Sequence, residues 1–183
     1  MRALGLDPVH DTRETFRALC DAMSRPGTIQ RTPVTPADHA VAATLVDHEV
    51  TAHTDDATLR DALTAQGRFE PADPEDAAVV HARDLPSWDV RDLGRGSLVE
   101  PSEGATVIYR VESISTAPAD DATTVRLSGP GVPGTRTASI GLPRAELEAI
   151  AEAQSTYPRG VDAVFAAEDR VLAMPRSTRT EVR

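Results

Sequence analysis

Residues 157–178 read YPRGVDAVFAAEDRVLAMPRST, and this stretch is the most informative part of the chain. It contains two short apolar runs, 163–167 and 171–174, joined by the charged turn 168–170. Two apolar runs separated by such a turn predict a β-hairpin. A Pro-Arg pair stands just outside each run, so an antiparallel hairpin would bring Arg159 and Arg176 toward the same end.

The two arginines leave two interpretations open. Arginine offers a planar fork of donors that suits a carboxylate or a phosphate. In the first interpretation, Asp162 pairs with one arginine and locks the hairpin. In the second, the arginines bind an external anion, which would be a triphosphate, a phosphonate or an acidic group on a partner subunit.

Outward from the hairpin, helical and strand patterns alternate along the chain. The residue patterns predict helices over 11–23, 38–46, 57–65 and 142–155, and strands over 50–53, 77–81, 105–111, 125–127 and 136–140. This alternation predicts an α/β fold with a central mixed sheet flanked by helices, and 183 residues fit a single domain over 1–183. In the first helix, Phe16, Leu19, Cys20 and Met23 form one apolar stripe, which predicts a buried Cys20.

The charge composition is unusual. The chain has 29 acidic and 19 basic residues, a net charge of -10, and every basic residue is Arg. Such an acidic chain fits either a basic partner or a surface adapted to high salt, and the scattered acids favour the second. No basic stripe with aromatic residues appears, so nucleic-acid binding is not expected. The single cysteine excludes an internal disulfide, and without a signal segment or an apolar span we expect a cytoplasmic protein.

Several motifs suggest chemistry that the sequence does not support. Residues 129–134 match G-x-G-x-x-G, but two of the six are prolines without an N–H and a strand pattern follows, so we expect a rigid turn. Ser128 is not expected to be a hydrolase nucleophile, because Arg126 stands where a nucleophile elbow has its first glycine. The five histidines fit no standard zinc spacing, so we expect surface or packing roles and no metal.

Four blocks of the sequence, taken in order, resemble the PhnH family, which is the H subunit of the carbon–phosphorus lyase system. The blocks are residues 16–27, with Phe-Arg-Ala-Leu and Ala-Met-Ser-Arg-Pro-Gly; residues 96–106, with Gly-Ser-Leu-Val-Glu-Pro and Gly-Ala-Thr; residues 127–132, with Leu-Ser-Gly-Pro-Gly-Val; and the closing Pro-Arg-Gly-Val-Asp and Pro-Arg-Ser-Thr. The middle segment, Asp55 to Asp84, fits the family pattern poorly and looks shortened.

The resemblance implies a fold similar to the large domain of pyridoxal-phosphate-dependent transferases. Because the chain has no lysine, it cannot form the Schiff base of those enzymes, and we expect a scaffold without that cofactor. We take Arg159, Asp162, Arg176, Thr178 and Ser128 as candidate ligand-binding or partner-binding residues.

The resemblance also implies a function. We expect a subunit of the complex that forms ribose 1-alkylphosphonate 5-triphosphate from a nucleoside triphosphate and a phosphonate, homodimeric and assembled with subunits G, I and J. Its expected role is non-catalytic or co-catalytic, with no cofactor of its own. The alternative is a stand-alone anion-binding or phosphate-binding domain, or a small transferase, that uses the paired arginines.

Overall fold

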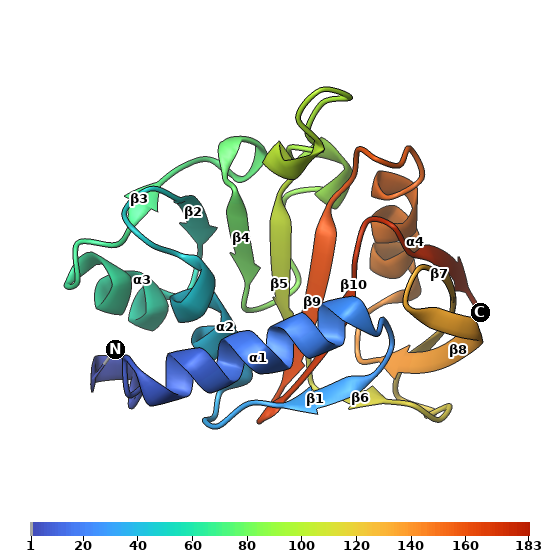
Figure 1. Ribbon diagram of the computed structural model, residues 1–183, viewed down its shortest axis with the longest axis horizontal. Coiled ribbons are helices and arrows are strands. Elements are labelled where there is room, and N and C mark those ends of the chain that lie inside the picture. Colours follow the sequence, from blue (N-terminus) through green and yellow to red (C-terminus); the bar gives the residue numbers. More distant parts are fainter. Residues whose placement is uncertain (1) are drawn as a thin grey trace.

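The computed structural model describes residues 2–183 and has an α/β fold with two sheets (Figure 1). Residues 2–183 form four α-helices, as the sequence predicted: α1 (His10–Ser24), α2 (Ala37–Leu45), α3 (Ala57–Thr64) and α4 (Arg144–Ala153). Four short 3-10 helices occupy Arg2–Leu4, Pro74–Asp76, Val90–Asp92 and Pro101–Glu103.

The larger sheet is mixed and has seven strands in the order β1-β10-β9-β5-β4-β2-β3. Its strands are β1 (Ile29–Arg31), β2 (Thr51–Thr54), β3 (Glu70–Pro71), β4 (Val79–Ala82), β5 (Thr106–Arg110), β9 (Asp162–Ala167) and β10 (Arg170–Met174). Strands β3, β2, β4, β5 and β9 are parallel, whereas β10 and β1 run antiparallel to their neighbours. The predicted mixed sheet is confirmed.

The closing hairpin is confirmed as well. Ala167 pairs with Arg170 next to the turn, and Ala163 pairs with Met174 at the far end. Both strands are almost entirely buried, and each lies inside the sheet: β9 is between β5 and β10, and β10 is between β9 and β1. The hairpin is therefore a central part of the sheet, and the residues that flank its open end are fixed in place by the core.

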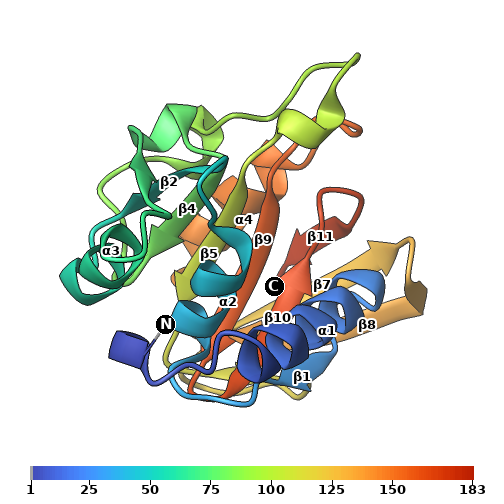
Figure 2. The same cartoon turned by 60° about the vertical axis from the view of Figure 1, so that its left-hand side comes forward.

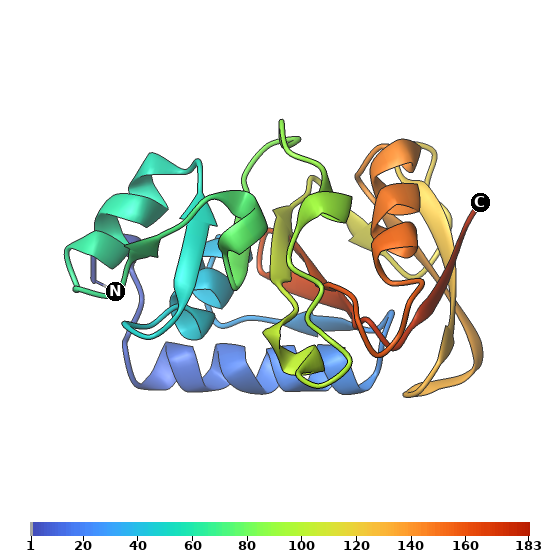
Figure 3. The same cartoon turned by 90° about the horizontal axis from the view of Figure 1, so that it is seen from above.

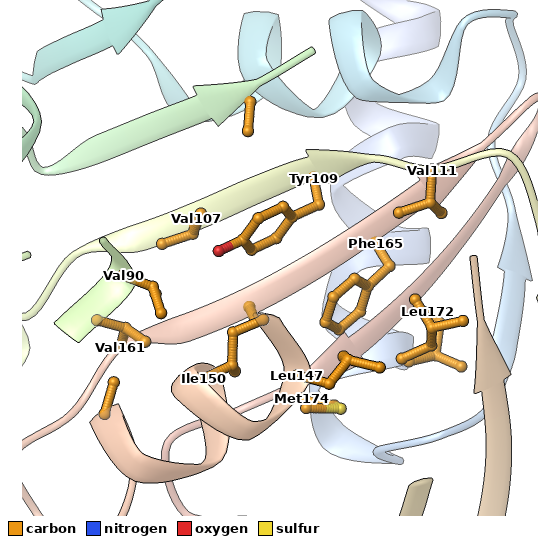
Figure 4. Packing of buried hydrophobic residues seen from close by; sticks show 14 of the residues in the cluster. Val90, Val107, Tyr109, Val111, Leu147, Ile150, Val161, Phe165, Leu172 and Met174 are labelled. Atoms are coloured by element: carbon orange, nitrogen blue, oxygen red, sulfur yellow. The ribbon is translucent and has the colours of Figure 1, made fainter. Parts of the chain in front are cut away.

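Helices cover both faces of the large sheet (Figure 3). Helices α1, α2 and α3 pack on one face, where Leu19, Val41 and Leu59 contact the strands. Helix α4 packs on the other face through Leu147 and Ile150, close to Tyr109 and Phe165, whose rings stack with centroids 5.7 Å apart (Figure 4). The aromatic pair supplies large side chains to a core otherwise made mainly of alanine and valine.

A second sheet, which the sequence did not predict, lies beyond β10 (Figure 2). It is antiparallel, in the order β11-β7-β8-β6, with strands β6 (Ile114–Ser115), β7 (Thr123–Gly129), β8 (Val132–Ile140) and β11 (Arg179–Val182). The glycine-rich segment forms the tight turn between β7 and β8, where Gly129 pairs with Val132. The predicted turn is confirmed, and no helix follows it.

The predicted orientation of α1 is wrong. The helix buries Thr15, Ala18, Leu19 and Ala22, while Cys20 is exposed and Phe16 is 53% exposed. Most of the buried residues of α1 are small, which lets the helix lie close to the sheet. The buried stripe of the helix is therefore shifted by about one residue from the predicted, more hydrophobic stripe. A 3.6-residue period fits both stripes and does not distinguish them.

Candidate functional site

The candidate residues of the hairpin lie at the amino-terminal edge of the parallel strands. Asp162 is the first residue of β9, and Arg176 follows β10, which returns antiparallel to the same edge. Strand β5 begins beside β9, with Thr106 paired to Asp162. The sequence blocks that include 104–106 and 158–162 are therefore neighbours in space, although they are more than fifty residues apart in the chain.

Arg176 and Asp162 form a tight ion pair. The Arg176 backbone N–H donates to Asp162 Oδ1 at 2.7 Å, and Nε and Nη2 donate to Oδ2 at 3.0 and 2.6 Å. The side chains are 13% and 16% exposed. A carboxylate that accepts from both the backbone and the guanidinium of one residue fixes that residue's position. This is the locking role that the first interpretation gave to Asp162.

The same guanidinium also holds the loop before β5. Arg176 Nη2 donates to the Gly104 carbonyl at 3.0 Å, and Nη1 donates to the Pro101 carbonyl. A Cβ atom at Gly104 would lie 2.3 Å from Arg176 Nη1 and 2.4 Å from the Gly160 carbonyl oxygen. Glycine is required at position 104 because any side chain would occupy the space of this contact.

Ser128, Thr178 and Arg176 line one pocket of about 960 Å³ between α4, the β7–β8 turn and the segment that joins β10 to β11. Thr178 is buried, and Ser128 pairs with Arg179 across β7 and β11. Arg159 lies outside this lining; its side chain is exposed and forms no ion pair with any residue in 2–183. The structure thus brings four of the five candidates together and leaves Arg159 at the surface.

The pocket offers binding groups rather than a catalytic constellation. Its lining contains Arg176, Arg179 and several hydroxyl groups, but no His, Cys, Asp or Glu. General acid–base and nucleophilic catalysis most often use one of these four residue types, and Tyr157 is the less common alternative that the lining contains. The arrangement suits an anionic, hydroxyl-bearing ligand or an acidic partner segment.

A second polar cluster, which the sequence did not predict, lies at the opposite, carboxyl-terminal edge of the parallel strands. His81 Nε2 bonds Asp38 Oδ2 at 3.0 Å, and His39 Nε2 bonds Asp56 Oδ2 at 3.1 Å. Each of these four residues is buried. Arg83 reaches Asp56 from the surface at 3.3 Å. The packing role expected for the histidines is confirmed for His39 and His81.

Burial and hydrogen bonding act in opposite directions on the two buried carboxylates. Burial raises the pKa of Asp56, but the Leu59 N–H and the His39 ring donate to it, so its pKa falls to about 2. Burial likewise raises the pKa of Asp38, but the hydrogen bond from His81 and the charges of His81, His39 and Arg110 together outweigh burial and lower the pKa. Asp56 also caps α3 through the Leu59 N–H at 3.0 Å. The carboxylates thus connect α2, α3 and β4.

The sequence missed several pocket residues, among them Gln154, Tyr157, Arg179 and Thr180. Gln154 ends α4, and its amide donates to the carbonyls of Val161 and Met174, so it ties the helix to both hairpin strands. A signal existed in the run Arg176–Thr180, where polar residues directly follow a buried strand. Within residues 2–183, no group of three His, Cys, Asp or Glu side chains is arranged to hold a metal ion. No helix in that range has the length and apolar character needed to cross a membrane.

Comparison with known families identifies the class of protein that carries this fold and site. Residues 5–181 match the family described as bacterial phosphonate metabolism protein (PhnH). Because the match covers almost the whole chain, the chain belongs to this family, and the resemblance drawn from the four sequence blocks is confirmed.

A named relative gives a more specific comparison. The chain is 30% identical to alpha-D-ribose 1-methylphosphonate 5-triphosphate synthase subunit PhnH of Rhizobium meliloti (strain 1021), over an alignment of 192 positions. The alignment covers 96% of this chain and 92% of the relative. The two proteins are therefore similar over their whole length, which includes both edges of the large sheet.

Proposed function

We propose that this chain is the H subunit of a carbon–phosphorus lyase system and acts in the catabolism of organic phosphonates. In this role it supports the formation of ribose 1-alkylphosphonate 5-triphosphate from a nucleoside triphosphate and a phosphonate. The observation that carries the proposal is the full-length similarity to a synthase subunit, 30% identical over 96% of the chain.

The proposed contribution of the subunit is binding and assembly, with no complete reaction of its own. The pocket beside Arg176 is lined by no His, Cys, Asp or Glu, the side chains most often used for proton transfer, which supports a proton-transfer partner on another subunit. Arg176 itself is engaged by Asp162 and by two carbonyls. These contacts support a co-catalytic or non-catalytic subunit over a transferase with two free arginines.

The proposal also covers the partners of this chain and its location in the cell. The partners are subunits G, I and J of the same system together with a second copy of this chain, and the complex works in the cytoplasm, where nucleoside triphosphates are available. The fold is proposed to be a relative of the pyridoxal-phosphate transferase scaffold that has lost the cofactor, in keeping with a chain that has no lysine. The net charge of -10 is proposed to be an adaptation to high salt.

Copurification from the native host tests the assembly. A tag on this chain is expected to recover untagged G, I and J subunits, and a phosphonate-dependent release of nucleobase is expected from the assembled complex but not from this chain alone. A tagged chain that recovers none of these subunits would favour the stand-alone anion-binding domain. Robust turnover by the purified chain would overturn the non-catalytic role.

A further inference from the structure

The pocket between α4, β7 and β11 differs in charge from the rest of the molecule. The chain carries 29 acidic residues, yet none of them lines this pocket, and two arginines do. Serine and threonine hydroxyls supply much of the remaining wall. Its volume of about 960 Å³ lies within the range of small-molecule sites. A pocket whose lining contains arginines and no acidic residue, in a protein of net charge -10, is suited to an anion.

Three buried polar atoms in the pocket wall have no hydrogen-bond partner among the described residues. They are Gln154 Oε1, Thr178 Oγ1 and Thr180 Oγ1. Thr178 is 3% exposed and Gln154 is 4% exposed. The side-chain NH2 group of Gln154 donates to two backbone carbonyls, so the unpaired atom of this side chain is Oε1. Buried polar atoms are rarely left unpaired in native proteins. A bound group with hydroxyls would supply the missing donor and acceptors after a small rotation of the threonine side chains.

The two walls of the pocket have different electrostatic character. One wall is the carboxyl end of α4, where the helix dipole places partial negative charge and favours hydroxyl donors over anions. The other wall is the paired strands β7 and β11, where Arg179 lies opposite Ser128. The exposed Arg179 guanidinium forms no ion pair within residues 2–183. An anionic group therefore fits at Arg179, and a neutral polyhydroxylated group fits against Gln154 and α4.

We propose that this pocket binds a phosphorylated pentose, with its phosphate at Arg179 and its ring hydroxyls at Gln154 and Thr178. The choice of a pentose rests on the proposed function, whereas the anion-plus-polyol chemistry rests on the pocket itself. In this arrangement Arg176 is a positioning residue: its pairing with Asp162 holds the segment that carries Thr178 and Arg179. The subunit would present a sugar phosphate to chemistry performed elsewhere in the complex.

Titration of the full-length chain with D-ribose 5-phosphate tests the site, with D-ribose and inorganic phosphate as separate probes at the same ionic strength. Calorimetry is expected to show ribose 5-phosphate binding at least about tenfold more tightly than either fragment, since both walls contribute. Thr178→Val and Arg179→Gln are each expected to weaken binding by about tenfold or more, which is the loss of one hydrogen bond or charged contact.

Matched variants outside the pocket control for general effects. Thr15→Val makes the same change in the middle of helix α1, at another buried threonine whose hydroxyl has no partner among residues 2–183, and Arg31→Gln makes the same charge change on β1; neither residue lines the pocket. Both are expected to bind ribose 5-phosphate as the wild type does. Because Arg179 is exposed, Arg179→Gln remains informative even if Thr178→Val unfolds the protein.

The outcomes separate this inference from the proposed function. No binding of ribose 5-phosphate at millimolar concentration, equal affinity for inorganic phosphate, or unchanged binding by Arg179→Gln would overturn the pentose site. None of those results would affect the proposed function, which is tested separately by copurification with the other subunits. Binding with the expected variant effects, in a chain that recovers no partner subunits, would support the site and overturn the subunit proposal.

Discussion

Asp162 and Arg176 close the β9–β10 hairpin at the end opposite its turn, with three hydrogen bonds to one carboxylate at 2.6–3.0 Å. The guanidinium then continues to the carbonyls of Pro101 and Gly104 in the loop before β5. One side chain thus joins two sequence blocks at the amino-terminal edge of the sheet. The fold is therefore expected to be sensitive to substitution of Asp162 and of Gly104.

Asp162→Ala is expected to lower the free energy of unfolding by about 3 kcal/mol, because it leaves a mostly buried guanidinium without its anion. Urea denaturation measures the change. The control is Glu181→Ala, which breaks exposed pairs with Arg126 at 3.3 Å and Arg183 at 3.2 Å and is expected to cost less than about 1 kcal/mol. Equal effects of the two substitutions would show that Asp162 does not lock the hairpin.

Gly104→Ala is expected to destabilise the protein by about 3 kcal/mol, the upper end of the range for overpacked sites. The added methyl group would lie 2.4 Å from a backbone oxygen, that of Gly160, which cannot rotate away. Gly94→Ala in the same loop is the control, because its nearest atom would be 3.6 Å away. Thermal melting of both variants tests the prediction, and a Gly104→Ala protein as stable as Gly94→Ala contradicts it.

The buried carboxylate of Asp56 predicts a loss of stability in acid. Its pKa in the folded state is about 2, below the ordinary value of 3.8, so the ionised form stabilises the fold above about pH 4. That contribution, about 2 kcal/mol, is lost as the pH falls through about 2. The stability difference between wild type and Asp56→Asn should therefore shrink between pH 4 and pH 2. The exposed neighbour Asp55→Asn serves as control, and a difference that stays constant over this range would argue against the assignment.

The acidic composition predicts stabilisation by salt. A net charge of -10 on 183 residues produces repulsion that salt screens. The melting temperature is expected to rise between low and molar KCl. Sorbitol at matched osmolality controls for effects that do not depend on charge. A melting temperature that does not change with KCl would remove the argument for adaptation to high salt.

The sequence predicted the helices and the mixed sheet because hydrophobic periodicity and turn residues decide them locally. It did not predict the four-stranded sheet as a separate layer, since β6 and β11 are short and polar and become recognisable only when they pair with β8 and β7. It assigned the wrong stripe to α1 because close packing against the sheet selected alanine and threonine over Phe16 and Cys20.

The candidate site shows the same limit. Arg176 and Asp162 could be predicted from the hairpin, because an antiparallel return brings both to one end. The contact of Arg176 with Gly104 could not, since it joins segments 72 residues apart. Gln154 and Arg179 become pocket residues only through the packing of α4 against β11. Local patterns therefore predicted the Asp162–Arg176 ion pair, whereas the pocket depends on tertiary packing.

Deletion of the gene for this chain in its native host tests whether the chain is an essential subunit of phosphonate catabolism. The measurement is growth on an alkylphosphonate that the host uses as its sole source of phosphorus. We predict that growth on the phosphonate is lost and growth on inorganic phosphate is kept. The wild-type gene should restore growth on the phosphonate, and Glu181→Ala should restore it equally well. Undiminished growth of the deletion strain on the phosphonate, with no second copy of the gene present, would contradict the account.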